Sequence, residues 1–124
     1  MIYGVGVDIL DSKRIARSKF DLDRFASSIL TKAERKIFNK HNDKLGFLSK
    51  RWAAKEAISK AIGCGITYIV HWQNIDILKN SQGKPVVKFR GSLYQLFKDS
   101  KVRCHLSISD ESNFCVAFAI LELE

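Results

Sequence analysis

The sequence predicts a small single domain of the α+β class, in which a mostly antiparallel sheet packs on a long alanine-rich helix. Three patterns carry this prediction: a helical apolar repeat in residues 51–66, strand-like alternation at the N-terminus, and further strand-like segments toward the C-terminus. The 124 residues, of which 46% are hydrophobic, are enough to bury one core without disulfides. We therefore expect residues 1–124 to form one domain.

The central helix is predicted from the segment 51–66, R-W-A-A-K-E-A-I-S-K-A-I-G-C-G-I, with its start near Leu45. Apolar residues recur in it at positions i, i+3, i+4, i+7 and i+8, which form one stripe on a helix: Ala54, Ala57, Ile58, Ala61 and Ile62. Small alanine side chains allow the helix axis to lie close to a neighbouring element. Gly63 and Gly65 are typical of a helix C-terminus, because glycine accepts a left-handed backbone.

Glu56 and Lys60 lie one turn apart on this helix and share a flank with Gly63. A surface ion pair, contributing only ~0.2–0.5 kcal/mol, is the simplest interpretation of such a pair. The alternative is a functional site, and it depends on a second carboxylate near the N-terminus.

The N-terminal segment I-Y-G-V-G-V-D-I is predicted to be a strand with two different faces. Tyr3, Val5, Val7 and Ile9 line one face, and Ile2, Gly4, Gly6 and Asp8 line the other. Two glycines on one face indicate that a ligand or another backbone comes very close there. Carboxylates at Asp8 and Glu56 suit Mg²⁺, which takes one or two protein carboxylates and fills its other positions with water and phosphate oxygens.

Basic residues gather after this strand, where Asp11 or Ser12 can cap a short helix. They are Lys13, Arg14, Arg17, Lys19 and Arg24, with the apolar Phe25 beside them. Such a cluster is either a solvated basic face or a docking surface for an acidic partner. Composition does not decide between the two.

The remaining elements follow from local patterns. Residues 31–34, T-K-A-E, form a capping box that starts a helix through Phe38. Residues 74–79 and 85–89 read as a hairpin whose turn contains Gly83 and Lys84, and a short helix follows. Residues 102–109 alternate as a strand with His105 on its polar face. Residues 114–121 are nearly all apolar, which predicts a strand buried on both sides.

Composition narrows the functional classes. Twenty-one Lys and Arg against thirteen Asp and Glu give a formal charge of +8, which favours polyanionic partners such as nucleic acid, an acidic protein or a phosphate-rich small molecule. Three cysteines without a C-x-x-C pattern indicate neither a disulfide framework nor a zinc site. No signal peptide or membrane span is recognisable, so we expect a cytoplasmic protein without membrane contact.

The order and spacing of four motifs resemble the holo-[acyl-carrier-protein] synthases of the 4'-phosphopantetheinyl transferase superfamily. They are G-V-G-V-D-I near the N-terminus, the 51–66 segment, G-K-P at 83–85 and H-L-S-I-S at 105–109. The resemblance implies the phosphopantetheinyl transferase fold and a role in fatty acid biosynthesis. The implied reaction moves 4'-phosphopantetheine from coenzyme A to a serine of an acidic apo acyl carrier protein, uses Mg²⁺ and releases adenosine 3',5'-bisphosphate.

The resemblance also implies roles for particular residues. Asp8 and Glu56 are expected to hold Mg²⁺, and Glu56, Lys60 and His105 to take part in catalysis. Residues expected near coenzyme A are Arg51, Lys60, Gly63, Gly65, Gly83, Lys84, Pro85 and His105. Arg14, Arg17, Arg24 and Phe25 are expected to dock the carrier protein.

Some points remain open at this stage. The acceptor of the serine proton is metal-bound water, Glu56 acting through water, or His105. G-K-P is otherwise only a hairpin tip. Asp110 stands where the family pattern has a second histidine, and we leave it outside the site. A homotrimer with active sites shared between subunits is implied by the resemblance alone.

Two competing functions are kept. A small basic nucleic-acid-binding domain is suggested by the charge of +8, although no stacking platform or binding motif is recognisable, so we expect no nucleic acid partner. A protein that binds coenzyme A without catalysis would differ from the enzyme only in turnover.

Overall fold

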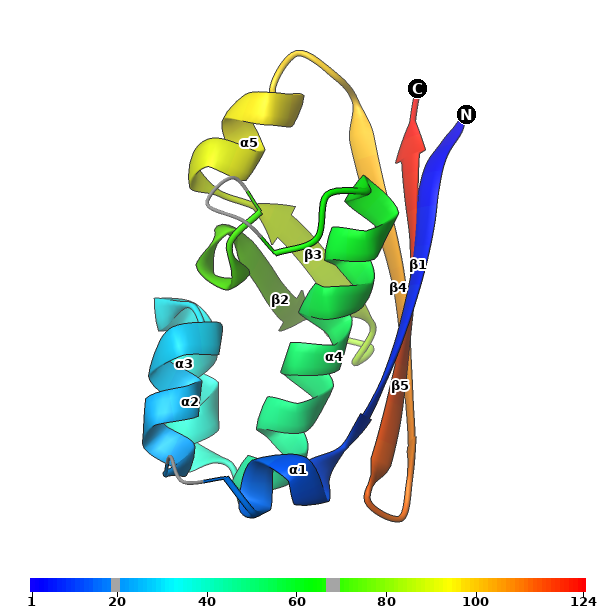
Figure 1. Ribbon diagram of the computed structural model, residues 1–124. Helices are drawn as coiled ribbons and strands as arrows, with labels where there is room; N and C mark the ends of the chain where they lie inside the picture. Colours follow the sequence, from blue (N-terminus) through cyan, green and yellow to red (C-terminus); the bar gives the residue numbers. More distant parts are fainter. Residues whose placement is uncertain (19–20, 67–69) are drawn as a thin grey trace.

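The computed structural model describes residues 1–18, 21–66 and 70–124, and it contains a three-stranded antiparallel sheet, a two-stranded sheet and several helices (Figure 1). The larger sheet has the order β1 (Ile2–Asp11), β5 (Phe114–Leu123), β4 (Val102–Glu111). Helix α4 (Lys44–Ile62) runs along one face of it. This architecture agrees with the predicted α+β class and its antiparallel sheet.

Helix α4 has a clear start and end. The side chain of Asp43 accepts a hydrogen bond from the Gly46 N–H at 3.0 Å, which caps the first turn. Gly63 ends the helix with a φ of 103°, in the left-handed region that favours glycine. All residues of the predicted apolar stripe are buried in the main core: Ala54, Ala57, Ile58, Ala61 and Ile62.

Strand β1 lies unusually close to α4. A Cβ atom on Gly4 would overlap the carbonyl oxygen of Ala61, and one on Gly6 would overlap that of Ala57. The glycines therefore allow a strand and a helix backbone to touch. Of the two explanations that the sequence left open at these positions, the neighbouring backbone is the one observed. Asp8 continues the same face of the strand toward α4.

Strand β5 differs from its prediction, because it is buried on one face only. Cys115, Ala117 and Ala119 point into the core, whereas Phe114, Val116 and Phe118 are exposed on the opposite face. All helices drawn in Figure 1 lie on the core side of the three-stranded sheet. The prediction of burial on both sides is wrong for the single chain, since a run of apolar residues does not reveal whether the second face is covered within the same chain.

Three short helices lead from β1 to α4. They are α1 (Ser12–Ala16), α2 (Leu22–Ile29) and α3 (Lys32–Lys40). Asp11 caps α1 by accepting from the Lys13 N–H at 3.0 Å. The predicted capping box at α3 is confirmed, with Thr31 Oγ1 accepting from the Glu34 N–H at 3.2 Å and Glu34 Oε1 accepting from the Thr31 N–H at 2.8 Å. Lys19, predicted as part of the basic cluster, lies outside the described residues.

The remaining elements form the predicted hairpin and its neighbours. They are the 3-10 helix η1 (Trp72–Asn74), β2 (Ile75–Lys79), β3 (Pro85–Phe89) and helix α5 (Gly91–Phe97). Strand β3 lies beside β4, so the hairpin extends the structure past the edge of the larger sheet. None of the described helices is long and apolar enough to cross a membrane.

Candidate active site

The predicted residues Asp8 and Lys60 are in direct contact. Lys60 Nζ donates to Asp8 Oδ1 at 3.1 Å and to the carbonyl oxygen of Val7 at 2.9 Å. The close packing of β1 on α4 brings the two side chains together, although they are 52 positions apart in sequence. The Asp8 side chain is about 20% exposed, so the pair lies at an accessible edge of this contact.

Glu56, one turn before Lys60, is held by a residue that the sequence analysis did not predict. Trp72 Nε1 donates to Glu56 Oε1 at 3.0 Å, and Glu56 is half-buried. Asp8 contacts Lys60, and Glu56 precedes Lys60 by one turn on α4, so both predicted carboxylates neighbour Lys60.

The donor set of this contact fits a magnesium ion. Asp8 Oδ2 and Glu56 Oε2 make no hydrogen bond or ion pair to any residue that the structure describes, so each carboxylate has one oxygen available. Nowhere in residues 1–18, 21–66 and 70–124 do three metal-ligating side chains gather. Two carboxylates suit Mg²⁺, which leaves several of its positions to water and substrate oxygens.

Gly63 and Gly65, predicted near the cofactor, follow the end of α4 with φ angles of 103° and 66°. No described atom lies within 4 Å of a Cβ atom built at either position. Glycine is therefore favoured at both positions by the left-handed backbone and not by a close neighbour. The space that a side chain would occupy there is open among the described residues.

A second group of predicted residues meets in a separate groove. Lys84 and Pro85 from the hairpin and His105 from β4 line an open hollow of about 570 Å³ between β3 and β4. Gly83 precedes them in the turn with a φ of 81°, and its N–H donates to the carbonyl of Asn80 at 3.0 Å. The hairpin tip therefore lies beside His105, so one ligand in this hollow could contact both.

His105 does not join Asp8 and Glu56 within one chain. Its neighbours across the sheet are Ile120 and then Val5, on the outer face, whereas Asp8 is on the inner face against α4. His105 Nε2 lies 3.1 Å from Glu122 Oε1, and this hydrogen bond is the main reason that the pKa of Glu122 is below its ordinary value. Within a single chain the sheet therefore separates His105 from Glu56 and Lys60, the other two predicted catalytic residues.

Arg51, predicted as a coenzyme A contact, has an enclosed side chain. Its side chain is only 4% exposed, its Nε lies 3.6 Å from Glu34 Oε2, and its guanidinium packs 4.5 Å from the centre of the Phe47 ring. Burial lowers the pKa of Arg51 and the Glu34 carboxylate opposes that shift. A side chain so enclosed has little surface left for a nucleotide, so Arg51 belongs to the interior of the chain.

The predicted docking residues lie on the N-terminal helices. Arg14, Arg17 and Arg24 are exposed, and Phe25 is half-buried. Arg24 and Phe25 border a small hollow of about 250 Å³, whose other walls are Ser28, Ile29, Trp52 and Trp72. Asp110, left outside the site, pairs with Lys50 at 3.4 Å.

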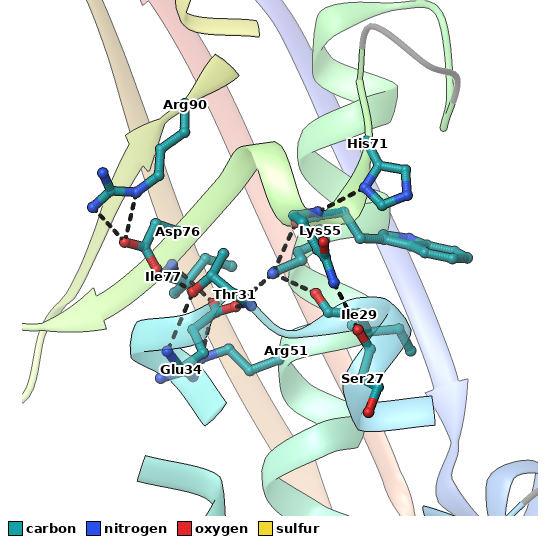
Figure 2. A network of polar contacts seen from close by, with 12 residues as sticks. Ser27, Ile29, Thr31, Glu34, Arg51, Lys55, His71, Asp76, Ile77 and Arg90 are labelled. Carbon is teal, nitrogen blue, oxygen red and sulfur yellow. Dashed lines mark hydrogen bonds and ion pairs between the residues drawn. The ribbon is translucent and has the colours of Figure 1, made fainter. Parts of the chain in front are cut away.

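Sequence reasoning missed a buried polar network around Lys55 of α4, next to Glu56 (Figure 2). Lys55 Nζ donates to Glu34 Oε1 at 2.6 Å, to the carbonyl of Ile29 at 2.7 Å and to the carbonyl of Trp72 at 2.9 Å. Thr31 Oγ1 donates to Asp76 Oδ1 at 2.6 Å, and Arg90 donates to Asp76 Oδ2. Lys55 lies between the alanine pair at 53–54 and Glu56, but α4 has three other lysines, so its position gave no distinct signal in the sequence.

Comparison with known proteins defines the class of the chain. Residues 4–119 match the family model described as 4'-phosphopantetheinyl transferase superfamily. The chain is 42% identical to the holo-[acyl-carrier-protein] synthase of Vesicomyosocius okutanii, covering 100% of this chain and 99% of that protein. It is 43% identical to the synthase of Nitrosospira multiformis, with coverages of 98% and 99%.

Solved structures agree with this assignment. The holo-[acyl-carrier-protein] synthase of Neisseria meningitidis is 40% identical and superimposes with a TM-score of 0.91, covering 98% of this chain and 99% of that one. The synthase of Bacillus anthracis, solved in complex with coenzyme A (3',5'-ADP), is 36% identical with a TM-score of 0.84 and coverages of 100% and 99%. The chain belongs to the 4'-phosphopantetheinyl transferase superfamily, and its relatives are holo-[acyl-carrier-protein] synthases. This favours a transferase over the nucleic-acid-binding alternative.

Proposed function

We propose that residues 1–124 act as a single holo-[acyl-carrier-protein] synthase domain. The chain transfers 4'-phosphopantetheine from coenzyme A to a serine of an acidic apo acyl carrier protein and releases adenosine 3',5'-bisphosphate. The observation that carries this proposal is the contact between Asp8 and Lys60, one helical turn from Glu56, in a chain whose full length matches synthases. The proposed setting is fatty acid biosynthesis in the cytoplasm.

The residues of the β1–α4 contact have distinct proposed roles. Asp8 and Glu56 hold Mg²⁺, which when bound neutralises diphosphate charge and favours departure of the leaving phosphate. Lys60 adds a positive charge beside the same phosphates. Within one chain Glu56 is better situated than His105 to receive the serine proton through water, and in the proposed trimer His105 would reach such a site only from a neighbouring subunit.

The coenzyme A nucleotide is proposed to contact two regions that come from neighbouring subunits of the trimer, the glycine turn after α4 of one subunit and the hairpin groove of the next. Gly63 and Gly65 offer backbone amides at the end of α4, with open space above them. Lys84, Pro85 and His105 supply a cation, an apolar surface and a hydrogen-bonding ring in the groove beside β4. Arg51 is left out of this proposed contact because its side chain is buried.

The outer face of the large sheet supports a homotrimer with shared sites. Its apolar side chains remain exposed in the single chain, and they are Val5, Val7, Ile9, Phe114, Val116 and Phe118. A continuous exposed apolar surface is typical of a protein interface. His105 lies on the same face, so assembly would bring it toward a neighbouring subunit. Sedimentation equilibrium is expected to give three times the mass of 14.1 kDa, and a monomeric mass would remove this proposal.

Docking of the carrier protein is proposed for the N-terminal helices. Arg14, Arg17 and Arg24 present exposed positive charge to an acidic helix, and Phe25 offers an apolar contact among them. Exposed charges of this kind act mainly on association, which weakens as salt screens them. The KM for the carrier should therefore rise with ionic strength while the KM for coenzyme A changes less.

The proposed function is tested by incubating the protein with apo acyl carrier protein, coenzyme A and Mg²⁺. Mass spectrometry should then detect a carrier heavier by one phosphopantetheine group. Omission of coenzyme A, or addition of a chelator, should prevent the change. If coenzyme A binds but no acidic carrier gains mass, the chain is a coenzyme A binding protein and not a transferase.

A further inference from the structure

We infer that Trp72 is a positioning residue for Glu56, and that the buried Lys55 fixes Trp72. The inference rests on the proposed function, because Glu56 is assigned to magnesium there. Trp72 lies in the 3-10 helix η1, outside every motif that the sequence analysis used.

The side chain of Trp72 restrains the Glu56 carboxylate. Its Nε1–H donates to Glu56 Oε1 at 3.0 Å. An indole N–H is only a donor, so this contact engages one carboxylate oxygen and limits rotation of the group. Glu56 Oε2 has no partner among the residues that the structure describes, and it is the oxygen left for an ion. Partners that orient a ligating side chain in this way contribute strongly to metal affinity.

The indole ring is itself held by other aromatic rings. Trp72 packs edge-on against Trp52, with ring centroids 6.2 Å apart and an interplanar angle of 80°. Trp52 in turn packs on Phe25 at 5.5 Å. Both spacings lie in the range of favourable aromatic pairs. The aromatic cluster of Phe25, Trp52 and Trp72 therefore fixes the direction of the N–H toward Glu56.

The backbone of Trp72 is held from the opposite side by Lys55. The Lys55 ammonium is fully buried and donates to the Trp72 carbonyl at 2.9 Å, to the Ile29 carbonyl and to Glu34 Oε1 (Figure 2). These three acceptors match the three N–H donors of an ammonium group. Consecutive residues of α4 thus touch the two ends of one tryptophan, with Lys55 at its carbonyl and Glu56 at its indole.

The activity test compares Trp72→Phe with Trp52→Phe. Both variants lose an indole N–H from the same aromatic cluster, but only the first loses the hydrogen bond to Glu56. Trp72→Phe should raise the Mg²⁺ concentration for half-maximal transfer by about 10- to 100-fold, as expected for a partner of a metal ligand. Because Trp52→Phe keeps an aromatic ring against the indole of Trp72, it should leave this concentration within about threefold of the wild type. Equal half-maximal Mg²⁺ concentrations in the two variants would overturn the inference.

A second readout needs no transfer activity. The chain has two tryptophans, so ¹⁵N NMR should give two indole signals, which Trp72→Phe assigns. Glu56→Ala should shift the Trp72 indole signal and leave that of Trp52 nearly unchanged. With coenzyme A present, Mn²⁺ should broaden the Trp72 signal in the wild type and much less in Glu56→Ala.

The two readouts separate the inference from the proposed function. A wild type that shows the Glu56-dependent signals but transfers nothing would contradict the proposed function and leave the positioning role standing. Suppose instead that the protein transfers phosphopantetheine, but Glu56→Ala does not shift the Trp72 indole signal and Mn²⁺ does not broaden it. This result would overturn the positioning role alone.

Discussion

Lys60 Nζ lies 3.1 Å from Asp8 Oδ1, so a strand and a helix that are far apart in sequence are joined by one ion pair. The same ammonium binds the Val7 carbonyl at 2.9 Å. The contact holds the Asp8 carboxylate against α4 before any ligand arrives. Because the Lys60 side chain is 53% exposed, the pair contributes little to stability, and its value lies in the arrangement of the site.

Replacement of Lys60 should therefore affect activity far more than folding. Lys60→Gln is expected to lower kcat/KM for phosphopantetheine transfer by about 10²–10³-fold, because it removes the positive charge that the proposed function assigns to the phosphates. The free energy of unfolding should fall by less than about 1 kcal/mol. Lys36→Gln removes an exposed lysine elsewhere and is the matched control. A Lys60→Gln protein as active as this control would exclude Lys60 from the site.

Substitution at Gly6 should disturb the same contact through the backbone. The Cβ of Gly6→Ala would overlap the Ala57 carbonyl, so β1 or α4 must shift, at a cost of about 1–3 kcal/mol or more. Asp8 would move away from Lys60, and transfer activity should fall. Urea unfolding and activity assays measure both effects, with Lys36→Gln, at an exposed position of α3, as control. Unchanged stability would mean that the backbones are not in contact in solution.

Removing one partner of the buried Glu34–Lys55 pair should lower the free energy of unfolding more than removing both partners. Both side chains are 0% exposed and lie 2.6 Å apart. Glu34→Gln leaves the ammonium without its carboxylate, which should cost about 3–5 kcal/mol. Adding Lys55→Met to that variant should recover part of the loss. Lys101→Met, which breaks an exposed pair with Glu124 at 3.7 Å, should cost less than about 1 kcal/mol at the same protein concentration.

If Glu34→Gln and the wild type unfold at the same urea concentration, the buried pair is not costly to break and the prediction is wrong.

The cysteines should differ sharply in reactivity. Burial raises the pKa of Cys104 to about 12 and is the main cause that raises the pKa of Cys115 to about 11, whereas Cys64 is exposed. Because only the thiolate reacts, at pH 8 on the order of one Cys104 thiol in ten thousand is reactive. A thiol reagent should label one cysteine rapidly, and Cys64→Ser should abolish this fast phase. Rapid labelling of Cys64→Ser at pH 8 would contradict the burial of the other two.

Local sequence patterns predicted much of the fold. The capping box at Thr31 and Glu34 is a short-range signal, and it appears at the start of α3 as expected. The alternation of glycines with valines in β1 indicated which face a ligand or another backbone approaches, and α4 supplies such a backbone. Such signals depend on neighbouring residues, so a single sequence contains them.

Features that depend on distant residues were not predictable in this way. The contact of Trp72 with Glu56 joins a connecting segment to a helix flank, and nothing near Trp72 in the sequence indicates it. The burial of Arg51 results from Glu34 and Phe47 closing around it. The position of His105 on the outer face follows from strand register, which separates it from Asp8 despite their shared family motifs.

The central claim is that Asp8 and Glu56 together hold one divalent ion. The most direct measurement is the electron paramagnetic resonance signal of free Mn²⁺, titrated with protein in the presence of coenzyme A. The wild type should bind one Mn²⁺ per chain, and Asp8→Asn combined with Glu56→Gln should weaken binding by about 100-fold, while Lys36→Gln binds normally. Equal Mn²⁺ affinity in the wild type and the double variant would contradict the claim.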